Sequence, residues 1–225
     1  MKKLLPILFV LIITSCSKEV PSDRLVERDG IYYEVNSQTG FTGTSISYYE
    51  NGQLEEKRNY KSGKENGLKE EFYKNGQIKE KQNYKNGKRD GPWIWFWENG
   101  SIFQKGFFIE GKQEGVFELR TDDGSSVEIK TYRNGLRDGL TTNTMMILNR
   151  IDDQFEWYSV VNYKDGELHG LVESTHDYSY EKIKNRMYFK EGKLDGTFES
   201  FDEDGQLIQR TCYQDGDEVV MSYCD

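Results

Sequence analysis

Short apolar and polar runs alternate along the chain and are interrupted by glycines at a fixed interval. Within residues 44–139 the sequence divides into four segments of equal length: Thr44–Gly67, Leu68–Gly91, Pro92–Gly115 and Val116–Gly139. The glycines that end these segments lie 24 positions apart, as subtraction of their numbers shows. A fixed period in this range is typical of repeat architectures, in which each unit packs on its neighbours.

Each unit predicts a β-hairpin. In the second unit, two extended runs over 68–73 and 78–84 flank Asn75-Gly76. Asn-Gly between such runs is a strong hairpin signal, because a type I′ turn requires positive φ at both central residues. A helix is disfavoured, since each glycine in its interior would cost about 1 kcal/mol. The equivalent turn glycines of the four units are Gly52, Gly76, Gly100 and Gly124.

An aromatic residue recurs three positions before a second glycine of each unit. These residues are Tyr60, Tyr84, Phe108 and Tyr132. In stacked hairpins their side chains would form a ladder along the sheet, stabilised by area burial and ring contacts. We therefore expect an all-β fold, an elongated single-layer antiparallel β-meander of repeated hairpins that depends on contacts between neighbouring units.

The period changes after Gly139 and then recovers. The unit 140–170 is longer by seven residues and the unit 171–196 by two, whereas the terminal unit 197–225 returns to register. Such insertions are expected to lengthen hairpins or loops at one edge of the array. Upstream, residues 30–43 resemble a degenerate first unit that caps the array. The predicted repeat domain is therefore 30–225.

The N-terminal residues predict an export signal. Lys2 and Lys3 precede an apolar run of ten residues, Leu4–Ile13, which is half the length needed to span a bilayer. The run ends in Ile-Thr-Ser-Cys at 13–16, which resembles the lipobox of bacterial lipoproteins. The resemblance implies cleavage before Cys16 and diacylation of that residue, and an ordinary secretory signal with an incidental cysteine is the alternative.

This interpretation divides the start of the chain into a signal peptide, 1–15, and a lipidated tether, 16–29. Acylation of Cys16 would anchor the protein stably in a membrane of the cell envelope. Ser17 follows the cysteine where aspartate would hint at retention in the inner membrane, which favours the outer membrane. Periplasmic and surface-facing orientations both stay open.

The third unit is the most aromatic. Trp93, Trp95 and Trp97 alternate with Ile94 and Phe96, so both faces of this strand carry large apolar groups. Two interpretations remain open: both faces are covered at this point, or Trp93, Trp95, Trp97 and Phe96 form a binding face for a partner chain or a sugar. A large exposed apolar patch would favour the second interpretation.

Composition narrows the function. The formal net charge is −9, which argues against nucleic-acid binding, because that depends on phosphate neutralisation by Lys and Arg. Charged residues make up 31% of the chain, as in disordered proteins, but 14% are aromatic and recur at fixed positions, which indicates a packed fold.

Candidate catalytic residues are few. The chain has two histidines. His169 lies where other units have Asn66, Asp90, Glu114 or Asp138, which predicts a polar turn residue, and His176 lies in an insertion. The sequence has no zinc-ligand spacing, no phosphate-binding loop and no EF-hand spacing at the acidic turn 202–205. We therefore expect no enzyme activity, no cofactor and no metal.

An exported chain would permit a disulfide between Cys212 and Cys224. A two-residue turn at Asp215-Gly216 would place Cys212 opposite Val219. If the hairpin continued regularly, Cys224 would lie opposite Leu207 on the other face. A regular hairpin therefore disfavours the bond, although the pairing stays open.

The repeated pattern resembles a known family. Tyr73-Lys74-Asn75-Gly76, followed by Tyr84-Lys85-Asn86-Gly87-Lys88-Arg89-Asp90-Gly91, is similar to the bacterial variant of the MORN repeat, and the likeness extends over about 30–223. The resemblance implies a long, twisted single-layer sheet used for binding or assembly. Proteins of this kind are commonly labelled YwqK-type antitoxins.

Three functions are compatible with these observations. The leading hypothesis is a membrane-anchored, non-catalytic scaffold that binds a protein partner. An antitoxin-like inhibitor and a cell-wall or carbohydrate-binding module are the alternatives. The oligomeric state stays open, because an open sheet has two edges that could pair.

Overall fold

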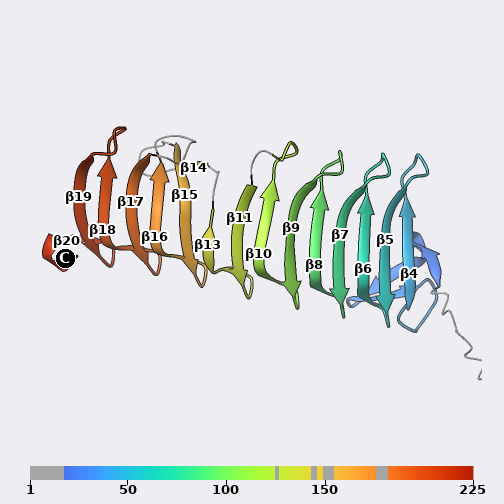
Figure 1. The fold of residues 1–225 in the computed structure, drawn as a ribbon. Helices are drawn as coiled ribbons and strands as arrows, with labels where there is room; N and C mark the ends of the chain where they lie inside the picture. The colour runs from blue at the N-terminus through green and yellow to red at the C-terminus, as the bar shows by residue number, and fades with distance from the viewer. Residues whose placement is uncertain (1–17, 125–126, 143–145, 149–154, 176–181, 225) are drawn as a thin grey trace, which may run out of the picture.

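The computed structural model describes residues 18–224 apart from 125–126, 143–145, 149–154 and 176–181. Most of the described strands form one elongated layer in which neighbouring strands are successive in the chain (Figure 1). The predicted signal peptide, the predicted lipidation site at Cys16 and His176 lie outside the described residues. Within the described part, no helix is long and apolar enough to cross a membrane.

Two long sheets make up the array. The first sheet contains β1 (Glu19–Pro21), β4 (Gly43–Tyr48), β5 (Leu54–Lys61), β6 (Lys64–Phe72), β7 (Ile78–Lys85), β8 (Lys88–Phe96), β9 (Ile102–Ile109), β10 (Lys112–Arg120), β11 (Val127–Arg133) and β12 (Leu136–Arg137). The second contains β13 (Gly139–Thr141), β14 (Met146–Leu148), β15 (Phe155–Lys164), β16 (Glu167–Thr175), β17 (Ile183–Lys190), β18 (Lys193–Phe201), β19 (Leu207–Gln214) and β20 (Asp217–Val219). These consecutive hairpins confirm the predicted all-β meander.

The two sheets join between β11 and β13. The amide of Thr142 donates to the carbonyl of Ile129 at 2.9 Å, and the amide of Asp138 donates to the carbonyl of Thr131 at 2.9 Å. These bonds continue the array where the strand order changes sheet (Figure 1). In the long unit 140–170, the extra chain adds β14 beside the start of β15.

The hairpin turns are of two kinds, and the sequence-based assignment of the first kind was wrong. At Asn75-Gly76 only the glycine has positive φ, 86°, so the turn is not type I′. Instead the Asn75 side chain accepts a hydrogen bond from the amide of Gln77 at 2.9 Å, which holds a wider loop. The second turn, Asn86-Gly87, has φ values of 53° and 82° and meets the type I′ requirement.

The predicted aromatic ladder forms on one face of the sheet. Each ladder aromatic pairs across the strands with a glycine: Tyr60 with Gly43, Tyr84 with Gly67, Phe108 with Gly91 and Tyr132 with Gly115. Because the glycine has no side chain, the ring can lie over the neighbouring backbone. Tyr60 and Phe108 are buried, and Tyr84 and Tyr132 are half-buried. We call this side of the sheet the aromatic face.

The N-terminal segment corrects the predicted tether. From Glu19 the chain belongs to the fold, because β1 pairs in parallel with β4. Val20 is buried against Phe41 and Tyr60, which explains why this segment is ordered although it lacks a periodic apolar pattern. A 3₁₀ turn, η1 (Ser22–Arg24), then leads into a hairpin of β2 (Leu25–Arg28) and β3 (Ile31–Glu34), which covers the first unit.

The C-terminal segment corrects the expectation about the cysteines. Cys212 pairs with Val219, as predicted, but β20 ends there. A second 3₁₀ turn, η2 (Met221–Tyr223), redirects the chain, and Cys224 forms a disulfide with Cys212 at a Cα–Cα distance of 5.9 Å. The prediction failed because it assumed that the strand continued to Cys224. The disulfide links β19 of the last hairpin to the segment that follows η2.

Candidate functional site

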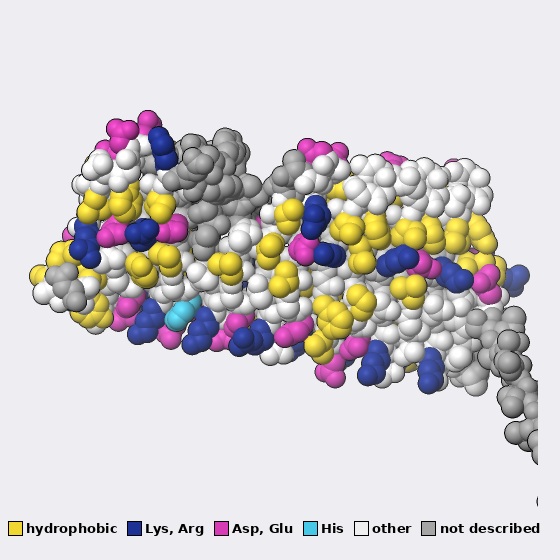
Figure 2. Space-filling view, viewed as in Figure 1, with side chains coloured by type: hydrophobic (Ala, Val, Ile, Leu, Met, Phe, Trp, Pro, Cys, Tyr) yellow, Lys and Arg dark blue, Asp and Glu magenta, His cyan; other side chains and the backbone are white. Residues whose placement is uncertain are grey.

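The sheet has two different faces, since side chains alternate along each strand. The aromatic face carries the ladder and the residues in register with it. The other side, which we call the opposite face, carries a row that begins with Ile46, Lys57, Glu70 and Lys81, each paired with the next across the strands. Figure 2 shows hydrophobic side chains in bands across the strands, with a line of charged side chains between them.

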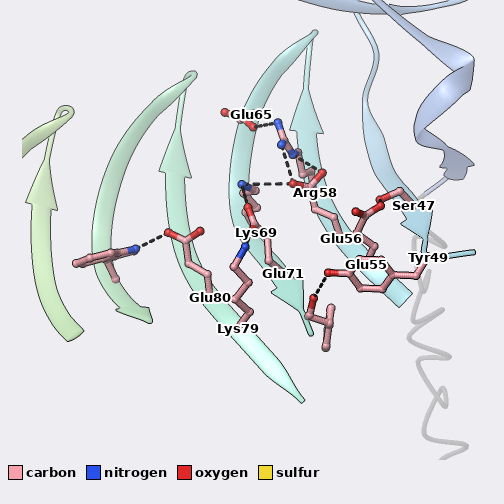
Figure 3. Close-up of polar contacts among 12 residues, drawn as sticks. Ser47, Tyr49, Glu55, Glu56, Arg58, Glu65, Lys69, Glu71, Lys79 and Glu80 are labelled. Atoms are coloured by element: carbon pink, nitrogen blue, oxygen red, sulfur yellow. Dashed lines mark hydrogen bonds and ion pairs between the residues drawn. The ribbon is translucent and has the colours of Figure 1, made fainter. Parts of the chain in front are cut away.

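An ion-pair network occupies the aromatic face over β5, β6 and β7 (Figure 3). Arg58 contacts Glu56 at 2.6 Å and Glu65 at 3.0 Å. Lys69 contacts Glu56 at 3.3 Å and also pairs with Glu71. Because every cation here faces at least one carboxylate, the network is a closed set of pairs and offers no free charge for a ligand.

The pKa values in this network agree with that interpretation. Burial raises the pKa of Glu71, but hydrogen bonds from Lys69 and Lys79 outweigh it and leave the pKa below its ordinary value. Burial lowers the pKa of Lys69, but the hydrogen bond to Glu71 and the negative charges of Glu71 and Glu56 together outweigh it and leave the pKa raised. Both groups are therefore held in their charged forms.

An aromatic cluster follows the network on the same face. Phe117 is only 1% exposed and packs between Phe108, at a ring-centroid distance of 5.6 Å, and Tyr132, at 5.1 Å. Trp93 lies 6.0 Å from Phe108 and 6.1 Å from Phe117. A Cβ added at Gly106 would lie 2.3 Å from the Phe117 ring, so the glycine gives this ring its place.

The structure assigns the predicted binding face mainly to packing. Trp93 is buried at 8% exposure, so it is a core residue and not an exposed contact. Trp95 and Trp97 pack on Phe103 at 5.3 and 4.4 Å, and the indole of Trp97 donates to the carbonyl of Arg120 at 3.2 Å. These two residues and Phe96 are half-buried.

A regular hydrogen bond on the opposite face identifies a site that the sequence analysis missed. The residue before each ladder aromatic donates to a carbonyl of the next strand in four units: Asn59 to Leu68, Asn83 to Pro92, Thr131 to Leu140 and Asn162 to Leu171. Phe107 and Tyr188 occupy the same position, and phenylalanine has no side-chain donor for this bond. Their exposed fractions are 44% and 39%.

Phe107 is the centre of an exposed apolar surface. It pairs across β8 and β9 with Pro92, and Pro92 is also exposed. Ile109, two residues further on the same side of β9, is 49% exposed, and Val116 on β10 is 52% exposed. We call Pro92, Phe107, Ile109 and Val116 the Phe107 ridge. The sequence did contain a signal, because Phe107 replaces Asn59 and Asn83 at the same position of the 24-residue period.

His169 is the third residue of β16, directly after the turn and not in the turn itself, which corrects the predicted turn position. In other units the side chain there accepts a hydrogen bond from the next turn: Asp90 from the amide of Glu110 at 3.2 Å and Glu114 from the amide of Asn134 at 2.8 Å. At His169 the Nδ1 atom is buried and makes no hydrogen bond. The residue thus replaces an acidic or amide group at the start of a strand.

The surface is also hollowed at the loops. One hollow of about 540 Å³ is lined by Tyr48, Tyr49, Glu50, Asn51, Glu55 and Lys74. Tyr49 is already committed to packing, since its hydroxyl donates to the carbonyl of Phe72 at 2.7 Å. In the described segments, no three His, Cys, Asp or Glu side chains lie together in a way that could hold a metal ion.

Comparison with known proteins gives a finding about the repeats. Four segments match the MORN repeat variant: residues 41–62, 65–86, 89–110 and 194–215. Each match contains one wide turn and its two flanking strands, so the matched unit corresponds to the hairpin seen in the structure. No curated protein matches the chain significantly.

Proposed function

We propose that the protein is a non-catalytic scaffold that binds another protein through the Phe107 ridge while a lipid on Cys16 holds it in the bacterial cell envelope, at the outer membrane. The observation that carries the binding proposal is the break in the hydrogen-bond pattern at Phe107. Support for the anchor comes from the apolar run and the cysteine that follows it.

The break in the hydrogen-bond pattern at Phe107 is informative because the fold loses a hydrogen bond there and gains no visible benefit in return. A donor at this position would bond the facing carbonyl of the next strand, and Phe107 gives up that bond. It also exposes an aromatic ring beside three other apolar residues. Positions at which a sequence departs from its own local rule are expected at functional sites. Aromatic anchors surrounded by apolar contacts are typical of protein interfaces.

Replacing Phe107 with Asn should separate binding from folding. Asparagine restores the donor found at Asn59 and Asn83, so we expect stability to be unchanged or higher by up to about 1 kcal/mol. We expect the captured partner to be lost. The measurement is a pull-down from the native envelope with a tagged full-length chain, together with chemical denaturation of the same variant.

The matched control is Tyr188→Asn, which introduces the same residue at the same position of a distant unit. Tyr188 is also an exposed aromatic residue, and it lies on β17, outside the Phe107 ridge. The control should keep the partner. A stoichiometric partner that the Phe107→Asn variant retains would contradict the ridge as the binding site. If the captured partner is a toxin encoded nearby, the scaffold acts as an antitoxin-like inhibitor.

The anchor is tested by Cys16→Ser. Without a thiol the residue cannot be diacylated, so we expect the protein to move from the membrane fraction to the soluble fraction. Only residues 17 and 18 separate Cys16 from β1, so an acylated Cys16 would hold the array close to the membrane surface. Intact-mass analysis of the unsubstituted protein should show the acyl chains, and a full-length chain without them would contradict the anchor.

A further inference from the structure

We infer that the Phe107 ridge and three lysines beside it form one docking surface for an extended protein segment that carries a carboxylate at every third residue. This inference rests on the proposed function and names the chemistry of the partner. The lysines are Lys64, Lys88 and Lys112, which we call the turn lysines. They begin β6, β8 and β10.

The turn lysines form a row on the opposite face, at the end of the strands nearest the ridge. Lys112 pairs with Ile109, a ridge residue. Lys64 and Lys88 pair in the same way with Lys61 and Lys85, which adds two further cations to the row. All five lysines are exposed. The row therefore presents positive charge directly beside an apolar surface.

Glycines of the following turns keep the row regular. A Cβ added at Gly87, Gly111 or Gly135 would lie 3.9, 4.0 or 3.6 Å from the Cβ of Lys64, Lys88 or Lys112, respectively. Each lysine stem thus starts beside a glycine one unit further along the array. Because this position has no side chain, the stem has room to lie along the row with its ammonium group in water.

The spacing selects an extended segment. The turn lysines begin every second strand, so they lie roughly 10 Å apart, which is two strand spacings. An extended chain in the polyproline II conformation rises about 3.1 Å per residue and has three residues per turn, so every third side chain of a segment that crosses the strands points to the same side and would meet a lysine. Residues between the carboxylates would then reach the apolar surface of the ridge.

Three carboxylates near the turn lysines already accept hydrogen bonds or form ion pairs within the fold. Asp90 and Glu114 lie close in sequence to Lys88 and Lys112, but they accept hydrogen bonds from the amides of Glu110 and Asn134 in the next turn. Glu65, next to Lys64, pairs with Arg58 on the aromatic face. These acidic groups serve the fold, so the lysines keep charge available for a partner.

An acidic segment fits this surface better than an anionic membrane. The chain carries a net charge of −9, and Glu70 and Glu118 lie on the same face as the turn lysines. The wide turns at the other end of the strands add exposed acidic residues such as Glu98 and Asp122. A flat anionic surface would meet all of these charges, whereas a single extended chain can follow the lysine row alone.

The test uses a labelled peptide in which glutamate recurs at every third position between leucine and serine. Binding to the purified full-length protein is measured by fluorescence anisotropy at low and physiological salt. The variant replaces Lys64, Lys88 and Lys112 with glutamate. The matched control makes the same change in net charge at three other exposed lysines far along the array, Lys164, Lys190 and Lys193.

We expect the turn-lysine variant to bind the peptide about tenfold more weakly, since three exposed ion pairs are lost. The control variant should change affinity less than twofold, and a peptide of the same composition with its glutamates adjacent should bind less tightly. Equal effects of the two variants, equal binding of the two peptides, or no saturable binding would overturn the inference. So would tighter binding to phosphatidylglycerol vesicles than to the peptide.

The native partner distinguishes this inference from the proposed function. A pull-down in which Phe107→Asn loses the partner and the turn-lysine variant keeps it leaves the scaffold intact and refutes the acidic segment. Loss in both variants, with retention in the Lys164, Lys190 and Lys193 control, supports both. Retention in all variants refutes both.

Discussion

Replacing Phe117 with alanine should unfold the middle of the array. This ring is the least exposed of the aromatic cluster and contacts Phe108, Trp93 and Tyr132. Removing a buried phenylalanine typically lowers the free energy of unfolding by about 3–5 kcal/mol. We expect a loss in that range, because a single-layer sheet has no second layer that could collapse into the cavity. Chemical denaturation measures it.

The control is Phe107→Ala on the neighbouring strand. This phenylalanine is 44% exposed on the opposite face, so its removal should change stability by no more than about 0.5 kcal/mol. Hydrogen exchange should locate the effect of Phe117→Ala in β8–β11, since repeat arrays lose stability locally. Equal losses in the two variants would show that the aromatic cluster is not the core of this region.

The fold was predictable from the sequence because glycines and aromatic residues recur at a fixed interval. Gly43 and Tyr60 repeat as a pair through the units, and the structure brings each such pair together across neighbouring strands. Because one position requires glycine and the position that faces it requires an aromatic residue, the same pair recurs in the sequence of each unit. Topology and the buried face follow from that pattern.

Structural features that depend on a single contact do not recur in the sequence and were not predicted. Val20 is one apolar residue in a charged segment, and its burial against Phe41 and Tyr60 joins the backbone pairing with β4 in making β1 part of the fold. The disulfide depends on η2, which bends the chain after Val219. The type of the wide turn depends on the side chain of Asn75, which accepts the amide of Gln77. Periodicity cannot report any of these.

At the candidate site, too, some features were predicted from the sequence and others became visible only in the structure. Aromatic richness drew attention to Trp93, which the structure buries in the cluster. Phe107 stood in the sequence as one more aromatic beside a ladder residue. Only the hydrogen bonds of Asn59 and Asn83 show that its position normally holds a donor, and that an exposed ring there is a departure.

The second large effect is expected at Gly63, where Gly63→Ala should detach the N-terminal cap. Gly63 has a φ of 77°, and its carbonyl accepts a hydrogen bond from the amide of Tyr32 at 2.8 Å. A Cβ added there would lie 2.2 Å from Cγ2 of Ile31 and 2.8 Å from the carbonyl oxygen of Tyr32. The variant therefore combines backbone strain with a clash against β3.

Gly52→Ala separates these two causes. Gly52 has a similar φ of 82°, but a Cβ added there meets nothing within 4 Å. The control should lose about 1–2 kcal/mol from left-handed strain alone. Gly63→Ala should lose about 1–3 kcal/mol more, because the β2–β3 hairpin must shift or leave.

The location of the loss decides the interpretation. If the cap docks through Gly63, hydrogen exchange in the Gly63→Ala variant should accelerate at Tyr32 and Phe41, whose amides bond the first unit and its cap. Exchange in β8–β11 should stay unchanged, because each unit depends on its immediate neighbours. If both glycine variants lose the same stability and the cap amides stay protected, close packing at Gly63 does not hold the cap. The buried contacts of Val20 with Phe41 and Tyr60 would then be sufficient to keep it in place.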